Sequence, residues 1–327
     1  MHKKVVAVVM GGYSSEFEIS IQSGQVVYES LSKTAYDVYR IHITKDSWYY
    51  KSEAGENFEI NKSDFSFSNG AQIIKPDVVF NAIHGTPGED GLLQAYFELI
   101  GLPHTSCNYY QAALTFNKRD CLSVLKSYGV HCANAYYLNK GDEIKPEDIV
   151  KKVGLPCFVK PSRSGSSFGI SKVKTIEELP AAIEVAYKED PEILIESCLI
   201  GTEISVGVIE YKGEIMVLPT TEIVSENEFF DYEAKYLGKS EEITPARIPE
   251  EETERVKAEA KRIYELLNMT GLSRSEYIIQ DGVPHFIEMN TNPGLSPESI
   301  IPKQAKAAGI SLEDLFGNLV ELAFQKK

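Results

Sequence analysis

The chain has 327 residues, 43% of them hydrophobic and 25% charged, which is the composition of a globular protein and not of a disordered one. This length exceeds what one hydrophobic core usually holds, so two or three domains are expected. The formal net charge of −15 argues against nucleic acid or an anionic membrane as the main partner, and no apolar run approaches the roughly 20 residues that span a bilayer.

The five cysteines are scattered and none belongs to a CxxC pair, so they indicate neither a zinc site nor a disulfide framework. The apolar run VVAVVM follows a basic trio near the N-terminus but is too short for a signal peptide. Together these features predict a cytoplasmic protein.

The first 105 residues alternate strand and helix signals, as in a small doubly wound α/β domain with a parallel sheet. Residues 3–10 are a run rich in β-branched residues that ends in two glycines, which predicts a buried parallel strand. Ser15 and Glu18 fit a capping box at the start of a helix that ends near Leu31. The other elements expected here are strands near 36–44 and at 77–83, a hairpin or elaborated loop over 45–72, and a helix with Leu92, Leu93, Tyr96, Leu99 and Ile100 on one face and Gly101 after its end.

From about residue 106 the pattern changes to short strands flanked by helices, which predicts a mixed, antiparallel α+β architecture. A charged and aromatic segment at 220–244 has no regular period and suits a lid or a binding loop. Asp281-Gly282 between two alternating runs is a strong hairpin signal. Helices are expected near 109–128, 175–188, 250–268 and 311–325, and strands at 134–138, 156–161, 169–173, 192–198, 203–218, 274–280 and 284–289.

The segment VKPSRSGSSFGI at 159–170 places a lysine at the end of a predicted strand, followed by a loop of glycines and serines. Such residues let backbone N–H groups converge on phosphate oxygens. Lys160 and Arg163 favour phosphate binding over the alternative, a flexible surface hairpin. The loop is not a P-loop, because the chain contains no GxxxxGK[ST] sequence.

A second segment places Arg274 and Glu276 on one predicted strand and Glu288 and Asn290 on its hairpin partner. Alternation along both strands can bring all four side chains to one face. Two carboxylates and an amide oxygen suit magnesium, and the arginine suits a phosphate or an oxyanion. The alternative, an exposed charged hairpin, is disfavoured by the continuation Thr-Asn-Pro-Gly.

Two further positions remain open when taken alone. His84 follows a predicted buried strand, where a histidine is more often structural than catalytic. Glu16 begins the first predicted helix, where a carboxylate favours the helix dipole in any case.

Six segments occur in the order GGYSSEFEIS (11–20), HGTPGEDG (84–91), NKRD (117–120), VKPSRSGSSFGI, FDYEAKY (230–236) and EMNTNPGLS (288–296). They resemble the motifs of the ATP-grasp ligases and, within these, of the D-alanine–D-alanine ligase family, and the resemblance covers almost the whole chain. It implies a three-domain ATP-grasp fold, with ATP between the central and C-terminal domains. The implied domains are an N-terminal α/β substrate-binding domain (1–105), a central ATP-grasp domain with the phosphate-binding loop (106–195), and a C-terminal ATP-grasp domain with a mobile loop and the magnesium site (196–327).

The resemblance also implies how ATP and metal are held. ATP phosphates would contact lysines, the adenine would meet a carboxylate on the hinge strand, and another carboxylate would hold the ribose. Two magnesium ions, which manganese can replace, would bridge the phosphates. In that order the residues are Lys118, Lys160 and Lys235 for the phosphates, Glu196 for the adenine, Glu203 for the ribose, and Glu276, Glu288 and Asn290 for the metal.

The substrates would be two D-alanine molecules. Glu16 would take the ammonium of the first, with His84 close by, and Ser299 would hold the carboxylate of the second. The oxyanion would be bound by Arg274 and the backbone N–H of Gly294. Ser166 and Tyr236 would join Glu16 in a hydrogen-bonded triad that links the phosphate loop, the mobile loop and the N-terminal domain.

This family activity implies an acylphosphate intermediate, because a carboxylate reacts with an amine only after its oxygen becomes a leaving group. The enzyme then acts mainly by positioning and charge neutralisation. Water must be kept from the intermediate, so a closing lid is expected, with 222–242 as the candidate. The product D-alanyl-D-alanine would serve peptidoglycan and cell-wall synthesis, and hence cell shape.

Two positions depart from the family pattern. The family usually has Asp where Glu276 stands, and some members have Lys-Trp where Ser197-Cys198 stands beside the adenine.

The position of Tyr236 is occupied by Phe in enzymes that make D-alanyl-D-lactate, so D-alanine is the expected acceptor, with D-serine left open.

Alternative functions are another ATP-grasp carboxylate–amine ligase and a regulator that binds nucleotide without catalysis. A dinucleotide-dependent oxidoreductase is disfavoured because GGYSSE lacks the GxGxxG spacing. Expected partners are ATP and D-alanine, with no nucleic acid and no membrane, and the resemblance favours a homodimer through the N-terminal domain.

Overall fold

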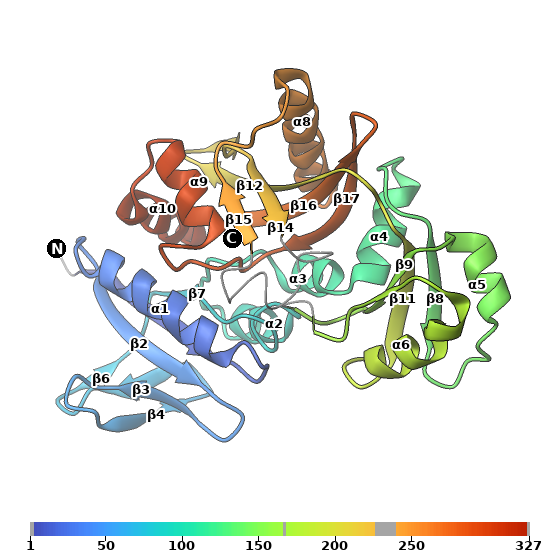
Figure 1. Ribbon diagram of the computed structural model, residues 1–327. Coiled ribbons are helices and arrows are strands. Elements are labelled where there is room, and N and C mark those ends of the chain that lie inside the picture. Colours follow the sequence, from blue (N-terminus) through green and yellow to red (C-terminus); the bar gives the residue numbers. More distant parts are fainter. Residues whose placement is uncertain (1–2, 166–167, 226–239, 326–327) are drawn as a thin grey trace.

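The described residues form three β-sheets, one in each part of the chain, that organise the fold (Figure 1). The computed structural model describes residues 3–165, 168–225 and 240–325. The predicted site residues Ser166, Lys235 and Tyr236, and most of the predicted lid, lie outside these ranges. No helix among the described residues is long and apolar enough to cross a membrane.

The N-terminal sheet has seven strands in the order β6-β5-β4-β3-β2-β1-β7. The apolar run at its centre is β1 (Val5–Gly11), which pairs in parallel with β2 (Asp37–Ile43) and β7 (Val78–Asn81), as predicted. The segment that was predicted as a hairpin or elaborated loop adds antiparallel strands to the edge of β2. These strands are β3 (Trp48–Lys51), β4 (Asn57–Asn61), β5 (Ser66–Ser68) and β6 (Ile73–Ile74).

The predicted capping box at the first helix is wrong. Helix α1 (Phe17–Leu31) begins after Glu16, and no side chain among the described residues caps its N-terminus. The nearby hydroxyl of Ser14 instead accepts the Glu16 N–H and donates to the His84 carbonyl. The loop before α1 is therefore fastened to the loop after β7, and this brings Glu16 and His84 together.

Helix α2 (Leu92–Leu99) begins and ends close to prediction, and Gly101 follows it with a φ of 66°. Its predicted apolar face is wrong, because Leu93 and Phe97 are buried whereas Leu92 and Leu99 are 62% and 88% exposed. Apolar residues occupy two adjoining faces of this helix, and the sheet covers only the face of Leu93 and Phe97.

The central sheet is fully antiparallel, in the order β10-β9-β11-β8, which confirms the predicted α+β pattern. Its strands are β8 (Ala135–Asn139), β9 (Cys157–Pro161), β10 (Ser171–Val173) and β11 (Glu192–Ser197). Helices α5 (Pro146–Val153), which the sequence analysis did not predict, and α6 (Leu179–Ala186) pack on one face. Because side chains alternate, Cys157 and Val159 point to this face, and Lys160 lies on the other.

The C-terminal sheet has six strands, β15-β14-β12-β16-β17 with β13 beside β12. The predicted hairpin is confirmed, since Asp281 and Gly282 have φ of 53° and 74° between β16 and β17. The elements are β12 (Thr202–Tyr211), β13 (Glu214–Val217), β14 (Thr221–Ser225), β15 (Ser240–Ile243), α8 (Glu250–Leu266), β16 (Leu272–Gln280), β17 (Val283–Asn290), α9 (Ile300–Ala307) and α10 (Leu312–Gln325).

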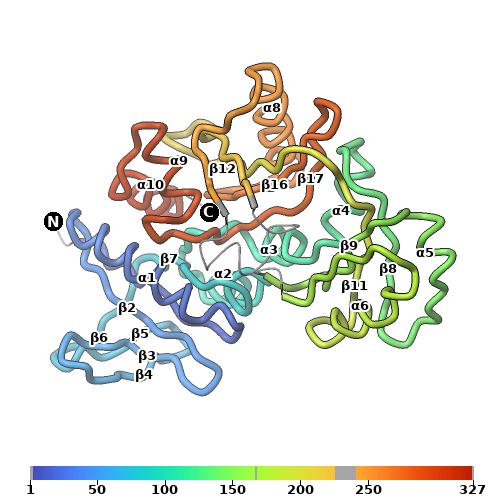
Figure 2. Tube along the Cα trace, in the orientation of Figure 1, coloured from blue at the N-terminus to red at the C-terminus, as the bar shows by residue number. Residues whose placement is uncertain are grey.

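Two groups of helices join sheets that are distant in sequence. The region predicted as one helix near 109–128 is two, α3 (Tyr109–Phe116) and α4 (Lys118–Ser127), which are separated at Asn117 and share a core with α8 and the C-terminal sheet. Helix α10 packs beside α1 on the N-terminal sheet (Figure 2), where Phe80 and Phe316 lie edge to face. The three units are thus tied together by shared cores.

Candidate active site

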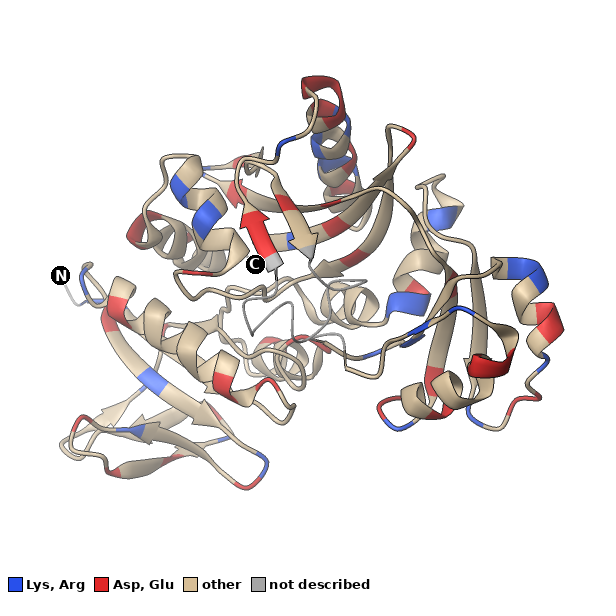
Figure 3. Cartoon of the chain, in the orientation of Figure 1, with Lys and Arg blue, Asp and Glu red and all other residues tan. Residues whose placement is uncertain are grey.

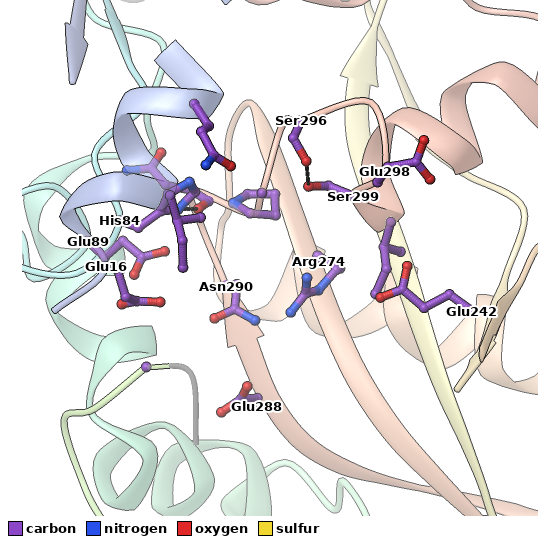
Figure 4. A pocket seen from close by; sticks show the side chains of 17 residues that line it. Glu16, His84, Glu89, Glu242, Arg274, Glu288, Asn290, Ser296, Glu298 and Ser299 are labelled. Carbon is purple, nitrogen blue, oxygen red and sulfur yellow. Dashed lines mark hydrogen bonds between the residues drawn. The ribbon is translucent and has the colours of Figure 1, made fainter. Parts of the chain in front are cut away.

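A cavity of about 320 Å³ lies where the three units meet (Figure 4). The N-terminal unit contributes the start of α1 and the loop after β7, the phosphate loop contributes Gly165, and the C-terminal unit contributes the rest. Seven of the predicted site residues line it: Glu16, His84, Arg274, Glu288, Asn290, Gly294 and Ser299. Segments up to about 280 residues apart therefore form one site.

The β16–β17 hairpin supplies the centre of the cavity. Arg274 lies opposite Asn290 in the strand register, and Glu276 lies opposite Glu288. Arg274 Nη2 donates to Glu276 Oε1 at 2.6 Å, and both side chains are largely buried. The pairing keeps the guanidinium in place beside the cavity, next to the two carboxylates.

Lys118 connects this hairpin to the phosphate loop. The Asn117 side chain caps α4, and Lys118 is the first residue of that helix. Its Nζ lies 3.0 Å from Glu288 Oε2 and donates to the Ser164 carbonyl at 2.8 Å. Its backbone N–H donates to the Ser162 carbonyl, so the start of α4 and the loop hold each other.

Lys160 and Glu196 form a second buried pair, with 2.8 Å between Nζ and Oε2. Burial lowers the pKa of Lys160, but the carboxylates of Glu196, Glu288 and Glu203 outweigh it, and the pKa is raised. One carboxylate each from the residues predicted to bind adenine, ribose and metal therefore stabilises the charge of this lysine.

Arg163 was interpreted from the sequence as favouring phosphate binding, but its guanidinium is engaged elsewhere. Its Nε and Nη2 donate to the buried carboxylate of Asp190 at 3.1 and 2.8 Å, and its backbone N–H donates to the same group at 2.7 Å. These three bonds anchor the beginning of the phosphate loop to the segment before β11.

Glu16 lies against the phosphate loop. A Cβ added at Gly165 would be 2.4 Å from Glu16 Oε2, so only glycine leaves this carboxylate where it is. The predicted triad partners Ser166 and Tyr236 are outside the described residues. The contact between Glu16 and Gly165 nonetheless brings the start of α1 to the residue that precedes Ser166.

His84 bonds through both ring nitrogens. Its Nδ1 lies 2.8 Å from the carbonyl oxygen of Asn292, and its Nε2 lies 2.9 Å from Ser23 Oγ. Burial lowers its pKa, and the charge of Arg274 acts in the same direction, whereas Glu16 and the bond to Asn292 act against it. The imidazole is therefore neutral near pH 7.

Gly294 and Ser299 face each other at the far side of the cavity. A Cβ at Gly294 would lie 2.8 Å from Ser299 Oγ, and that hydroxyl is 2.8 Å from Ser296 Oγ. The Gly294 N–H has no acceptor within the described ranges of the chain. This donor and Arg274 line the same cavity.

Glu89 lines the cavity but received no role from the sequence. Its Oε2 accepts the Gly85 N–H at 2.9 Å, and its side chain is buried. Burial, reinforced by the charge of Glu16, raises the pKa of Glu89 to about 8. An acidic residue just after the HG pair was visible in the sequence, but its burial depends on the tertiary fold.

A Glu89→Gln variant is expected to be clearly more stable than the unaltered protein at pH 8, with an advantage that shrinks to about 1 kcal/mol or less at pH 5. The folded protein keeps the Glu89 proton up to about pH 8, whereas the unfolded chain releases it near 4.5. Stability is therefore lost as the pH rises from 4.5 to 8, by on the order of 4 kcal/mol. Glutamine cannot ionise and avoids this loss.

The measurement is denaturant unfolding at both pH values, without nucleotide or metal. Glu18→Gln, at an exposed position in the first turn of α1, is the control. A Glu89→Gln protein with the same stability advantage at pH 5 and pH 8 would contradict the prediction.

The residues present fit magnesium. Glu276, Glu288 and Asn290 offer oxygen ligands from adjacent register pairs. Within the described ranges no group of three or more His, Cys, Asp and Glu side chains could hold a metal by itself. Magnesium commonly takes one or two carboxylates and completes its shell with phosphate oxygens and water, which is what this set allows.

Acidic side chains are spread over all three units (Figure 3), whereas this site brings buried cations together in a chain of net negative charge. The central antiparallel sheet and the C-terminal sheet enclose lysines and carboxylates that suit magnesium. An N-terminal α/β unit completes the cavity. This arrangement defines the ATP-grasp class of ligases.

Comparison with known proteins narrows this class. Residues 5–107 match the family described as D-ala D-ala ligase N-terminus, and residues 124–321 match D-ala D-ala ligase C-terminus. A D-alanine–D-alanine ligase from Flavobacterium johnsoniae is 67% identical over 98% of this chain and 99% of its own. The chain belongs to the D-alanine–D-alanine ligase family.

Solved structures agree with this assignment. A D-Ala:D-Ser ligase from Enterococcus faecalis has a TM-score of 0.86 and 32% identity, over 98% of this chain and 100% of that one. A D-alanine–D-alanine ligase from Bacillus anthracis, solved as a complex with ATP, has a TM-score of 0.79 and 28% identity over 98% of both chains.

Proposed function

We propose that this chain joins two molecules of D-alanine to D-alanyl-D-alanine, with ATP converted to ADP and phosphate, in the synthesis of peptidoglycan precursors. The observation that carries the proposal is the single cavity in which Glu16 from the N-terminal unit meets Arg274, Glu288 and Asn290 from the C-terminal hairpin. Full-length similarity to D-alanine–D-alanine ligases supports it.

The first D-alanine is bound by its ammonium group at Glu16, beside His84. Its carboxylate oxygen attacks the γ-phosphorus of ATP, the bond to the β,γ-bridging oxygen breaks, and ADP leaves an acylphosphate. Lys118, Lys160 and Lys235 neutralise phosphate charge, because little covalent chemistry is left for the protein in such a transfer. Glu196 receives the adenine amino group and Glu203 the ribose hydroxyls.

Glu276, Glu288 and Asn290 would hold the magnesium. When bound, magnesium supplies charge neutralisation and orientation of the phosphate oxygens. Glu276 is one methylene longer than the aspartate usual in the family, so its carboxylate has more conformations available. Its contact with Arg274 restricts the position of this carboxylate.

The amine of the second D-alanine attacks the carbonyl carbon of the acylphosphate. The carbon–oxygen bond to phosphate breaks, phosphate leaves, and the nitrogen loses a proton. Negative charge on the carbonyl oxygen is met by Arg274 and the Gly294 N–H, two donors that line the same cavity. Ser299 binds the carboxylate of the second D-alanine.

Tyr236 is proposed to select an amine acceptor by completing the triad with Glu16 and Ser166. A Tyr236→Phe variant is expected to raise the ratio of D-alanyl-D-lactate to D-alanyl-D-alanine when both acceptors compete near neutral pH, because a phenyl ring cannot hydrogen-bond. Product mass distinguishes the two. An unchanged ratio, with Tyr232→Phe in the same motif as control, would contradict this role.

We also propose that the chain works in the cytoplasm as a homodimer formed through its N-terminal unit, as the family resemblance implies. The proposed domains remain 1–105, 106–195 and 196–327, one for each sheet. Helices α3, α4 and α10 bridge these units by joining the cores of neighbouring sheets.

The decisive experiment measures phosphate release with ATP, Mg²⁺ and D-alanine, and identifies the product by mass. L-Alanine is the control, and D-serine is added as a competing acceptor because one structural neighbour is a D-Ala:D-Ser ligase. D-Alanyl-D-alanine as the main product is expected. Absence of dipeptide at saturating D-alanine would overturn the proposed function.

A further inference from the structure

The segment that carries Gly294 is held at both ends by one serine–histidine pair. Ser23 Oγ accepts the Leu295 N–H at 3.2 Å and lies 2.9 Å from His84 Nε2. The other ring nitrogen, Nδ1, lies 2.8 Å from the Asn292 carbonyl. These bonds form a closed ring, and Pro293 and Gly294 are the residues between its two attachment points.

The chemistry of the partners fixes the protons in this ring. A carbonyl oxygen can only accept, so His84 Nδ1 carries the hydrogen and Nε2 has a free electron pair. The Ser23 hydroxyl must therefore donate to Nε2, while its oxygen accepts from Leu295. The bonds run in one direction from the Leu295 N–H through Ser23 and His84 to the Asn292 carbonyl, and the opposite tautomer of His84 would lose the bond to Asn292 and reverse the one to Ser23.

The ring is buried and spans the boundary between units. Ser23 is 1% exposed and His84 is 5% exposed. Ser23 belongs to α1 and His84 to the loop after β7, whereas Asn292 and Leu295 follow β17. Asn292 adds a bond from its side-chain amide to the Gly88 carbonyl at 2.7 Å. The N-terminal unit thus sets the position of a segment that belongs to the C-terminal one.

We propose that Ser23 is a positioning residue for ligation: its hydroxyl donates to Nε2 of the His84 tautomer that the Asn292 carbonyl selects and, together with His84, holds the segment that presents Gly294 to the cavity. The inference rests on the proposed function, in which the Gly294 N–H binds the oxyanion. Ser23 does not line the cavity, so it acts through His84 and Leu295.

The test compares Ser23→Ala, Ser23→Thr and Ser30→Ala. Ser30 is the matched control, because it is a buried serine on the same helix whose hydroxyl donates to the Val26 carbonyl of its own helix. Imidazole ¹⁵N spectra report the tautomer directly, since protonated and unprotonated ring nitrogens resonate far apart. The chain has six histidines, and a His84→Gln sample assigns the His84 signals.

In the unaltered protein and in Ser30→Ala, His84 is expected to carry its hydrogen on Nδ1. In Ser23→Ala the Nε2 signal of His84 is expected to shift or to broaden, because the hydroxyl that donates to Nε2 is gone. Ser23→Ala should lower kcat about 10- to 100-fold per folded molecule, the cost of a displacement near 1 Å, with KM for ATP changed by less than about twofold. Ser23→Thr, which keeps the hydroxyl, should retain most of the activity.

An Nε2–H tautomer in the unaltered protein would overturn the proposal without any activity measurement. Equal losses in Ser23→Ala and Ser23→Thr, including a shared loss of fold, would also overturn it, as would kcat in Ser23→Ala equal to that of Ser30→Ala. If the unaltered protein makes no dipeptide, the proposed function fails instead, and the tautomer result still stands by itself.

Discussion

An Arg274→Ala variant is expected to fold and to turn over about 10²–10³-fold more slowly than the unaltered protein, which is the usual cost of losing one oxyanion donor. Arg274 lines the cavity beside Asn290 and is joined to Glu276 at 2.6 Å. The loss should appear in kcat, because the group acts on charge that develops only during the reaction.

The same substitution leaves the buried Glu276 carboxylate without the cation that now contacts it. Breaking a buried pair typically costs about 3–5 kcal/mol, so a lower Tm is expected as well. Arg262→Ala, which removes an arginine from the exposed side of α8, is the control for both the kcat and the Tm measurement. A folded Arg274→Ala protein within a few-fold of normal kcat would remove Arg274 from the reaction.

A Gly165→Ala variant is expected to raise KM for D-alanine about 10²-fold or more while the protein keeps its stability, because small displacements at a substrate-binding group can have effects of that size. The new methyl would lie 2.4 Å from Glu16 Oε2. The end of a flexible side chain can move away, so the fold tolerates the change. The carboxylate that holds the ammonium of the first D-alanine would no longer be in place.

Gly317→Ala is the matched control, because a Cβ at that helical glycine meets no atom within 4 Å. A double-mutant cycle gives a sharper result. If Gly165→Ala acts by displacing Glu16, it should add little to the defect of Glu16→Ala. A normal KM for D-alanine in Gly165→Ala, or fully additive effects in the cycle, would show that Glu16 and the loop are independent.

The sequence predicted those parts of the fold whose signals are local. The apolar run of β1 and the Asp281-Gly282 turn were identified because burial on both sides and positive φ leave direct marks in the residues. Helix α5 was missed because only Ile149 and Val153 in it are buried, which is too few for a clear period. The face of α2 was wrong because a helix with apolar residues on two faces does not reveal which one the sheet covers.

The candidate site, too, could be predicted only where its residues are close in sequence. Arg274, Glu276, Glu288 and Asn290 could be grouped from alternation on one hairpin, since their spacing is local. The partners of His84 could not be predicted, because Asn292 lies 208 positions further along the chain. The partner of Arg163 could not be predicted for a related reason: the carboxylate that holds it comes from Asp190, on a different strand connection.

The paired charges of the site have a consequence for how its ligands bind. Lys118 is paired with Glu288, Lys160 with Glu196, and Arg274 with Glu276, so each of these three cations is balanced by a carboxylate. A nucleotide that binds without metal would attract the lysines and leave unpaired carboxylates buried beside its phosphates. A metal that binds without nucleotide would take the carboxylates and leave the lysines and Arg274 unpaired. The magnesium–nucleotide complex satisfies both halves of these pairs in one exchange. Metal and nucleotide should therefore strengthen each other's binding, by equal factors in both directions.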